Sequence, residues 1–275
     1  MRDREQIGRG HVVPAVCCWC SAVGKAFVAP SRHLIDVRWN GRARSLFFMT
    51  PKRVVIVGAT GMVGGEALKL ALAHPLVSAV TVVGRRSCGV TSPELKEVLH
   101  EDFGDCSPLA ATLANQDVAL YCLGAYTGTL PDEEFRKVTV DYTSAFARAL
   151  HAASPGAAFC FLSGAGADPT ERSRMAFARY KGAAEKSLLA TGFARVHIFR
   201  PGYIYPVEQR REPSAMYRVS RALYPVLRGV MPSVRSDELA RVMLDVGLNG
   251  PGADAAPVLE NRDIRALGQR SGSAS

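Results

Sequence analysis

The feature that most constrains the fold of this chain is a glycine-rich run that directly follows an apolar stretch. Val54–Val57 leads into Gly58-Ala59-Thr60-Gly61-Met62-Val63-Gly64, after which apolar residues recur at helical spacing. A parallel strand that turns sharply into a helix needs such glycines, so that its backbone can bend and approach a pyrophosphate. The helix expected at Met62–Ala73 would direct its N-terminal amides at this anion. The run predicts a dinucleotide-binding loop, with these cofactor contacts: Gly58, Thr60, Gly61, Met62 and Val63.

The end of the second expected strand, Ala79–Val83, indicates which dinucleotide binds. About 20 residues after such a glycine loop, an acidic side chain would accept a hydrogen bond from a ribose 2′-hydroxyl. This chain has Gly84-Arg85-Arg86 there instead. A carboxylate would repel a 2′-phosphate, whereas a guanidinium binds it through two hydrogen bonds and can lie flat on the adenine. Arg85 and Arg86 therefore favour NADP(H) over NAD(H).

Beyond Lys52, apolar runs alternate with helical patterns, which indicates repeated strand–helix–strand units. We expect strands at 53–57, 79–83, 97–101, 118–123, 158–162 and 195–199, and a short one near 257–259. We expect helices at 62–73, 109–113, 133–153, 174–191, 215–227 and 236–248. The prediction is an α/β fold: a Rossmann-type doubly wound parallel sheet, in a single domain with a small C-terminal substrate-side cap.

The ends of four strands add further candidate contacts, because ligands of doubly wound sheets bind beyond the carboxyl ends of the strands. The third strand would place an acid and an aromatic ring at the adenine, and the fourth a glycine at the cofactor ribose. The fifth would present a hydroxyl near the nicotinamide, and the sixth a rigid turn over the nicotinamide side. These residues are Asp102 and Phe103, Leu123 and Gly124, Ser163, and Pro201.

The first 48 residues differ in character from the rest of the chain. They hold eight Lys or Arg residues against three Asp or Glu, and so carry more than half of the net charge of +9. Met49-Thr50-Pro51-Lys52 then leads into the first strand, as a natural start would. We interpret 1–48 as a poorly structured extension from a start assigned too far upstream, with an arginine-rich targeting segment as the alternative. Residues 49–268 would form the NAD(P)-binding domain and 269–275 a disordered tail.

Composition narrows the classes of function. Because much of the basic charge lies in the extension, we do not interpret it as nucleic-acid binding. No apolar run reaches the roughly 18 residues of a transmembrane segment. Cys17 and Cys20 lack a second ligand pair, and the other cysteines show no disulfide spacing, so we expect no metal and reduced thiols in a cytoplasmic protein. A semialdehyde dehydrogenase would need a nucleophilic cysteine in a loop, whereas Cys122 and Cys160 lie in strand-like runs.

A basic amphipathic segment, Glu208–Arg235, follows the sixth strand, where substrate-capping elements are inserted in this architecture. Its arginines alternate with apolar and aromatic residues. Such a segment could cover an acidic substrate, contact a protein partner, lie on a membrane surface or dock as an ordinary helix.

Together these motifs resemble the short-chain dehydrogenase/reductase superfamily, in its atypical NAD(P)-binding branch, and most closely the Tat-interacting-protein family of small oxidoreductase-like proteins. The resemblance covers residues 52 to about 268. It rests on the glycine loop and on Val83-Gly84-Arg85, Cys122-Leu123-Gly124, Ser163–Asp168, Lys181–Glu185, Phe199–Gly202 and Leu259–Ile264. The superfamily implies a catalytic Ser, Tyr and Lys, with the Tyr four residues before the Lys on one helix face. The resemblance therefore assigns catalytic roles to Ser163 and Lys181, and places Lys181 on the nicotinamide ribose.

The tyrosine that this pattern implies is replaced by Phe177, and Tyr180 should project to another helix face. General acid catalysis is typically worth roughly 10²–10⁴ in rate, so its loss would slow reduction without abolishing cofactor binding. Two hypotheses follow: a weak or unusual NADP(H)-dependent oxidoreductase on a small carbonyl substrate, and a non-catalytic NADP(H) sensor for a protein partner. In the first, the proton would come from a water or from another hydroxyl: Ser163, Tyr126, Tyr142 or Tyr203.

Overall fold

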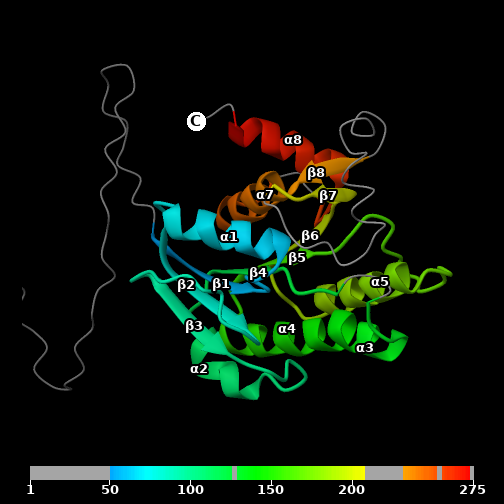
Figure 1. Ribbon diagram of the computed structural model, residues 1–275, viewed down its shortest axis with the longest axis horizontal. Helices are drawn as coiled ribbons and strands as arrows, with labels where there is room; N and C mark the ends of the chain where they lie inside the picture. Colours follow the sequence, from blue (N-terminus) through cyan, green and yellow to red (C-terminus); the bar gives the residue numbers. More distant parts are fainter. Residues whose placement is uncertain (1–49, 126–128, 208–231, 253–255, 273–275) are drawn as a thin grey trace, which may run out of the picture. The chain divides into compact units, whose positions relative to one another are not determined.

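The structure is a computed structural model that describes residues 50–125, 129–207, 232–252 and 256–272 (Figure 1). Several features expected from the sequence therefore lie outside the described residues. These are the extension 1–48, Tyr126, the expected helix 215–227 and most of the basic segment Glu208–Arg235.

Seven parallel strands form the central sheet, in the order β3-β2-β1-β4-β5-β6-β9. Their bounds are β1 Lys52–Val57, β2 Val77–Gly84, β3 Leu95–Leu99, β4 Val118–Tyr121, β5 Ala158–Leu162, β6 Arg195–Arg200 and β9 Val258–Glu260. The chain adds β2 and β3 on one side of β1 and then returns to place β4 on the other side. The direction of winding thus reverses between β1 and β4, and the predicted doubly wound parallel sheet is confirmed.

Helices cover both faces of this sheet (Figure 1). On one face lie α1 (Met62–Ala73), α7 (Ser236–Asn249) and α8 (Asn261–Gly272), and on the other α2 (Ala110–Leu113), α4 (Tyr142–Ala153) and α5 (Ala176–Leu189). A short helix, α3 (Asp132–Arg136), and a π-helical segment, Lys137–Asp141, lead into α4. Strands β7 (Tyr203–Tyr205) and β8 (Ser233–Arg235) form a separate parallel pair.

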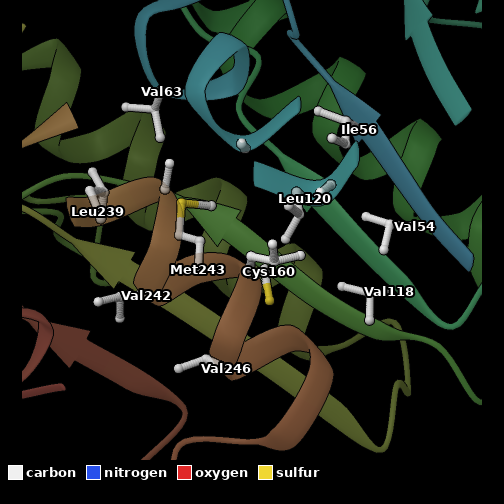
Figure 2. Close-up of a cluster of buried hydrophobic side chains, with 14 of the residues drawn as sticks. Val54, Ile56, Val63, Val118, Leu120, Cys160, Leu239, Val242, Met243 and Val246 are labelled. Carbon is white, nitrogen blue, oxygen red and sulfur yellow. The ribbon is translucent and has the colours of Figure 1, made fainter. Parts of the chain in front are cut away.

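The apolar runs that predicted the strands are explained by burial on both faces. Successive side chains of a strand point to opposite faces, so Val54 and Ile56 pack toward α1 and α7, whereas Val55 and Val57 pack toward α2, α4 and α5. Figure 2 shows the first of these two cores, where β1, β4 and β5 meet the apolar side of α7. These four residues of β1 are at most 1% exposed, as expected for a strand in the interior of the sheet, between β2 and β4.

Some elements differ from those expected. β3 begins and ends two residues earlier than predicted, because its register is set by pairing with β2, from Val80 opposite Leu95 to Gly84 opposite Leu99. The expected helix 133–153 is interrupted by the π-helical segment. Neither the β7–β8 pair nor α8 was expected, and α8 continues to Gly272, past the predicted domain end at 268. Among the described residues, no helix has the length and apolar character needed to cross a membrane.

Candidate functional site

The glycine loop joins β1 to α1 at the point where the sheet reverses its winding. Gly58 has φ of +85°, and a Cβ there would lie 2.8 Å from the carbonyl carbon of Cys122. Only glycine satisfies both conditions without strain. The Cys122 amide also donates to the Val57 carbonyl at 2.9 Å, so the loop is held directly against the end of β4. This is the crevice where doubly wound sheets bind their ligands.

A pocket opens beside this loop, and we call it the glycine-loop pocket. Its lining residues come from the ends of β1, β2 and β4 and from the loop after β3: Gly58, Ala59, Thr60, Val82, Val83, Gly84, Arg85, Arg86, Phe103 and Leu123. Six of the predicted cofactor contacts therefore share one pocket. The predicted set did not contain Ala59, Val82, Val83 or Gly84, although all four directly adjoin predicted residues.

The two arginines after β2 are the charged residues of the glycine-loop pocket. Both side chains are exposed, and within the described part of the chain neither has an ion-pair or hydrogen-bond partner. Two unpaired guanidinium groups beside a glycine loop can bind a phosphate without first breaking another interaction. The positive charge of the pocket thus fits the phosphates of a pyridine dinucleotide.

The remaining predicted contacts at the cofactor end differ in position. Phe103 is 1% exposed and packs in the core as well as lining the pocket. Asp102 is exposed and accepts a hydrogen bond from the Gly104 amide at 2.9 Å, within a turn. Val63 is buried in the core and Met62 begins α1, so these two reach the loop through their backbone. Asp102 stays a prediction without a pocket contact.

At the other end of the crevice, one face of α5 packs against the end of β5. Phe177, Lys181 and Glu185 are spaced four residues apart and therefore lie on the same face of α5. The ring tip of Phe177 would lie 2.5 Å from a Cβ on Gly164, the residue after Ser163. Phe177 therefore lies where the missing tyrosine would, beside the predicted catalytic serine.

Lys181 is buried in the crevice and is not an ordinary surface lysine. It is 7% exposed, and its Nζ donates to the Leu162 carbonyl at 2.8 Å and lies 4.8 Å from the centre of the Phe161 ring. A Cβ on Gly124 would be 3.9 Å from the same Nζ, which brings the ends of β4 and β5 together. Burial lowers the pKa of Lys181 to about 8, against an opposing effect of the Glu185 charge.

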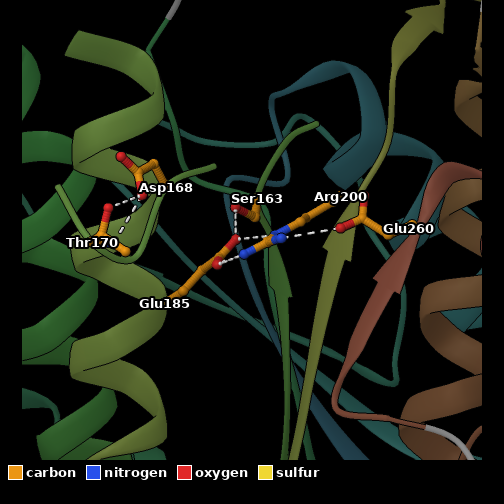
Figure 3. Close-up of polar contacts among 6 residues, drawn as sticks. All are labelled: Ser163, Asp168, Thr170, Glu185, Arg200 and Glu260. Carbon is orange, nitrogen blue, oxygen red and sulfur yellow. Dashed lines mark hydrogen bonds and ion pairs between the residues drawn. The ribbon is translucent and has the colours of Figure 1, made fainter. Parts of the chain in front are cut away.

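Ser163 and the buried Glu185 belong to a set of interacting polar side chains that also contains the partly exposed Arg200 and Glu260, and we call it the Ser163 cluster (Figure 3). The Ser163 hydroxyl donates to Glu185 Oε1 at 2.5 Å. Arg200 donates to both oxygens of Glu185, at 3.0 and 2.5 Å, and to Glu260 Oε1 at 3.0 Å. Glu185 is 1% exposed, and its bonds raise the pKa of Arg200. The guanidinium is therefore permanently charged, and Glu185 is its ion-pair partner.

The loop after β5 is fixed from both sides. The Ser163 amide donates to the Phe199 carbonyl, and the Ala165 amide donates to the carbonyl of Pro201, both at 2.8 Å. Pro201 thus lies directly against the Ser163 loop, and its contact with the nicotinamide stays a prediction. Asp168 ends this loop and accepts hydrogen bonds from Thr170, Arg172 and Ser173, which is a structural role (Figure 3).

The structure describes two of the tyrosines considered as alternative proton donors, Tyr142 and Tyr203, and also Tyr180. The Tyr180 hydroxyl donates to Asp132 Oδ2 at 2.6 Å, so it is engaged by α3. The Tyr142 ring packs against Phe103, with 6.0 Å between ring centres. Tyr203 lies in β7.

Burial of the cysteine thiols argues against thiol chemistry at this site. Burial raises the pKa of Cys122 to about 12 and also raises that of Cys160. A nucleophilic cysteine needs a lowered pKa, so neither residue suits a semialdehyde dehydrogenase mechanism. Over the described ranges, no group of three or more His, Cys, Asp or Glu side chains is arranged to hold a metal.

The sequence interpretation missed Glu185, Arg200 and Glu260 as members of the site. A signal was present, because Glu185 follows Lys181 by one helical turn and Arg200 ends an apolar strand. A second hollow, of about 360 Å³, lies between α7 and α8. Its lining contains no predicted site residue.

The chain is similar in sequence to one family model and to several known proteins. Residues 53–149 match the family model "Semialdehyde dehydrogenase, NAD binding domain". The chain is 31% identical over 235 residues to Protein HTATIP2 of Rattus norvegicus, which covers 84% of this chain and 95% of the relative. It is 26% identical over 225 residues to Protein FMP52, mitochondrial, of Candida albicans, covering 76% and 95%.

Solved structures show the same fold at low sequence identity. Gre2 of Candida albicans in complex with NADPH matches with a TM-score of 0.59 at 14% identity, over 76% of this chain and 78% of that one. DesIV, a dTDP-glucose 4,6-dehydratase from Streptomyces venezuelae with NAD and TYD bound, matches with a TM-score of 0.59 at 18% identity, over 81% and 82%. These likenesses extend over most of the chain.

Proposed function

The chain belongs to the HTATIP2 family of atypical short-chain dehydrogenase/reductases, and from this premise we propose that it binds NADP(H) and acts as a weak oxidoreductase on small carbonyl substrates. The observation that carries the cofactor preference is the pair of unpartnered arginines in the glycine-loop pocket. Gly58 and Leu123 would border the dinucleotide, Arg85 and Arg86 its 2′-phosphate, and Lys181 the nicotinamide ribose. When bound, the nicotinamide would supply or accept a hydride.

The structures of similar fold do not decide between the two nucleotides, because Gre2 is described with NADPH and DesIV with NAD. The preference must be measured on the full-length protein, by titration with NADPH and NADH while nicotinamide fluorescence and thermal stability are followed. We expect NADPH to bind at least tenfold tighter, which corresponds to about 1.4 kcal/mol.

Arg85→Ala should remove this preference, because it deletes a charge that faces the 2′-phosphate. Arg265→Ala is the matched control, since Arg265 is also exposed but lies on α8. Equal affinity for both nucleotides in the wild type would contradict the NADP assignment. Binding of neither nucleotide would contradict the whole proposal.

Catalysis rests on Ser163 and Lys181, which the fold brings to one end of the crevice, but the phenol between them is absent. Phe177→Tyr should raise the turnover of a model aldehyde with NADPH, by up to about 10² if the new hydroxyl donates to the substrate oxygen. Tyr180→Phe is the control, because its hydroxyl is bound to Asp132 and its loss should leave turnover unchanged.

The second candidate function is a non-catalytic NADP(H) sensor for a protein partner. It is favoured by Phe177 and by the hydrogen bond that the Ser163 hydroxyl donates to Glu185. Nucleotide binding without turnover in either the wild type or Phe177→Tyr would support it. A cytoplasmic location also remains a prediction, and the Candida albicans relative carries the word mitochondrial in its name.

A further inference from the structure

The hydrogen bond between Ser163 and Glu185 determines what the serine can offer a ligand. A hydroxyl has one hydrogen to donate and two lone pairs that can accept. The hydrogen of Ser163 is directed to Glu185 Oε1 at 2.5 Å. Glu185 is the ion-pair partner of Arg200, so it accepts and does not donate. Only the lone pairs of Ser163 remain for a ligand.

Because Ser163 can accept but not donate a hydrogen bond in this arrangement, it favours one class of substrate. A carbonyl oxygen requires a donor, and Ser163 can supply one only when Glu185 carries a proton, so the Ser163–Glu185 bond seen here favours the alcohol member of a carbonyl–alcohol pair. An alcohol presents an O–H that can donate to the Ser163 oxygen, and it has a hydride-bearing carbon beside that oxygen. Lys181 Nζ donates one of its three hydrogens to the Leu162 carbonyl, and the proposed function assigns the others to the nicotinamide ribose. The Tyr180 hydroxyl donates to Asp132.

We propose that Ser163 and Glu185 form a proton relay for alcohol oxidation, in place of the phenol that Phe177 lacks; this rests on the proposed NADP(H) function. The substrate hydroxyl gives its proton to Ser163 Oγ while the Ser163 proton moves to Glu185 Oε1. The C–H bond of the alcohol breaks as its hydride passes to NADP⁺, and the C–O bond becomes C=O. The alcohol is oxidised, NADP⁺ is reduced, and the proton on Glu185 is later released to solvent.

Arg200 and Glu260 limit the free-energy cost of this proton transfer inside the protein. When Glu185 accepts the proton, it no longer balances the guanidinium charge, and an unpaired buried charge is costly. Arg200 keeps its hydrogen bond to Glu260 Oε1 at 3.0 Å, and the Glu260 side chain is 44% exposed. Glu185 acts through Ser163 and is thus a positioning residue that also holds the proton.

The first test measures binding without turnover. Benzyl alcohol and benzaldehyde are titrated into the protein saturated with the non-reactive reduced analogue tetrahydro-NADP, by calorimetry. We expect the alcohol to bind at least about tenfold tighter than the aldehyde, equivalent to about 1.4 kcal/mol, and Ser163→Ala to abolish the difference. Equal or reversed affinities in the wild type overturn the proposal.

The second test separates proton transfer from hydrogen bonding. In Glu185→Gln the amide oxygen still accepts from Ser163 but cannot take a proton, so alcohol binding should persist while oxidation by NADP⁺ falls by roughly 10² or more. Glu94→Gln is the matched control, because Glu94 accepts from Ser92 at the same 2.5 Å on the exposed surface.

The outcomes are distinguishable from failure of the proposed function. If tetrahydro-NADP does not bind, the cofactor assignment itself fails. If it binds and Phe177→Tyr oxidises benzyl alcohol while the wild type does not, the relay is refuted. If Glu185→Gln does not fold, the proposal is still tested by the difference in affinity between benzyl alcohol and benzaldehyde and by its loss in Ser163→Ala.

Discussion

The two ends of the crevice are built by different means. At the cofactor end, the geometry comes from backbone contacts between neighbouring strands, as where Gly58 meets Cys122. At the substrate end, it comes from side chains of β5, α5, β6 and β9 that converge on Ser163. Few substitutions are tolerated where the geometry depends on close backbone contacts. Where it depends on side chains, a single group such as the tyrosine hydroxyl can be lost while the fold is kept.

The largest effect on stability is expected for a substitution of Gly58, at the cofactor end. Gly58→Ala adds a Cβ at a positive φ and within 2.8 Å of the Cys122 backbone, so we expect a loss of about 3 kcal/mol or more in unfolding free energy and loss of nucleotide binding. Gly89→Ala is the matched control, with φ of +70° and no atom within 4 Å. Urea unfolding should show a loss of only about 1 kcal/mol for it. Similar losses in the two variants would mean that the close approach is unimportant.

The substrate end can be probed by the pH dependence of stability. The pKa of Lys181 is lowered in the folded protein, from 10.5 to about 8, so between these pH values the unfolded chain binds more protons. The unfolding free energy of the wild type should therefore rise with pH across this window, relative to Lys181→Met, by at most about 3 kcal/mol. Parallel curves for the two proteins would show that Lys181 is not buried as described.

A smaller effect is expected where the Phe177 ring meets the Ser163 loop. Gly164→Ala would place its Cβ 2.5 Å from the ring tip, so the ring must move, and we expect a loss of about 1–2 kcal/mol. The double variant Gly164→Ala with Phe177→Ala removes the clash. Its loss should therefore be less than the sum of the two single losses, and strict additivity would contradict this contact.

The smallest effect concerns the side of α5 that faces away from Ser163. Tyr180→Phe removes the hydrogen bond to Asp132 near the surface, and we expect a loss of about 0.5–1 kcal/mol with unchanged nucleotide affinity. Thermal unfolding with and without NADPH checks both parts. A change in affinity would show that this face also shapes the site.

The sequence singled out neighbouring residues at the cofactor end for a physical reason. The glycine loop, the strand before it and the arginines after β2 are short contiguous motifs whose geometry is set by neighbours in the chain. Gly58, Thr60, Arg85, Arg86, Phe103 and Leu123 accordingly share one pocket. The sheet was predictable for a similar reason, since its central strands are apolar throughout.

The substrate end was predicted only in part, because its hydrogen bonds join residues far apart in the sequence. Ser163 and Glu185 are separated by 22 residues, and Arg200 and Glu260 by 60. α8 was missed because it offers few apolar residues: among its side chains of described burial, Ile264 is fully buried and Leu267 is partly buried. β3 was misplaced by two residues because it is a partly exposed edge strand, where apolar pattern specifies register weakly.

The contact between Phe177 and Gly164 also bears on ancestry. Phenylalanine and tyrosine codons differ by a single nucleotide, so descendants of this gene can exchange the phenol for a bare ring in one step. Gly164 cannot be substituted freely while an aromatic ring occupies position 177, because any side chain at position 164 would contact the ring tip. We therefore expect position 164 to stay glycine among relatives with an aromatic residue at position 177, whether or not they retain the hydroxyl.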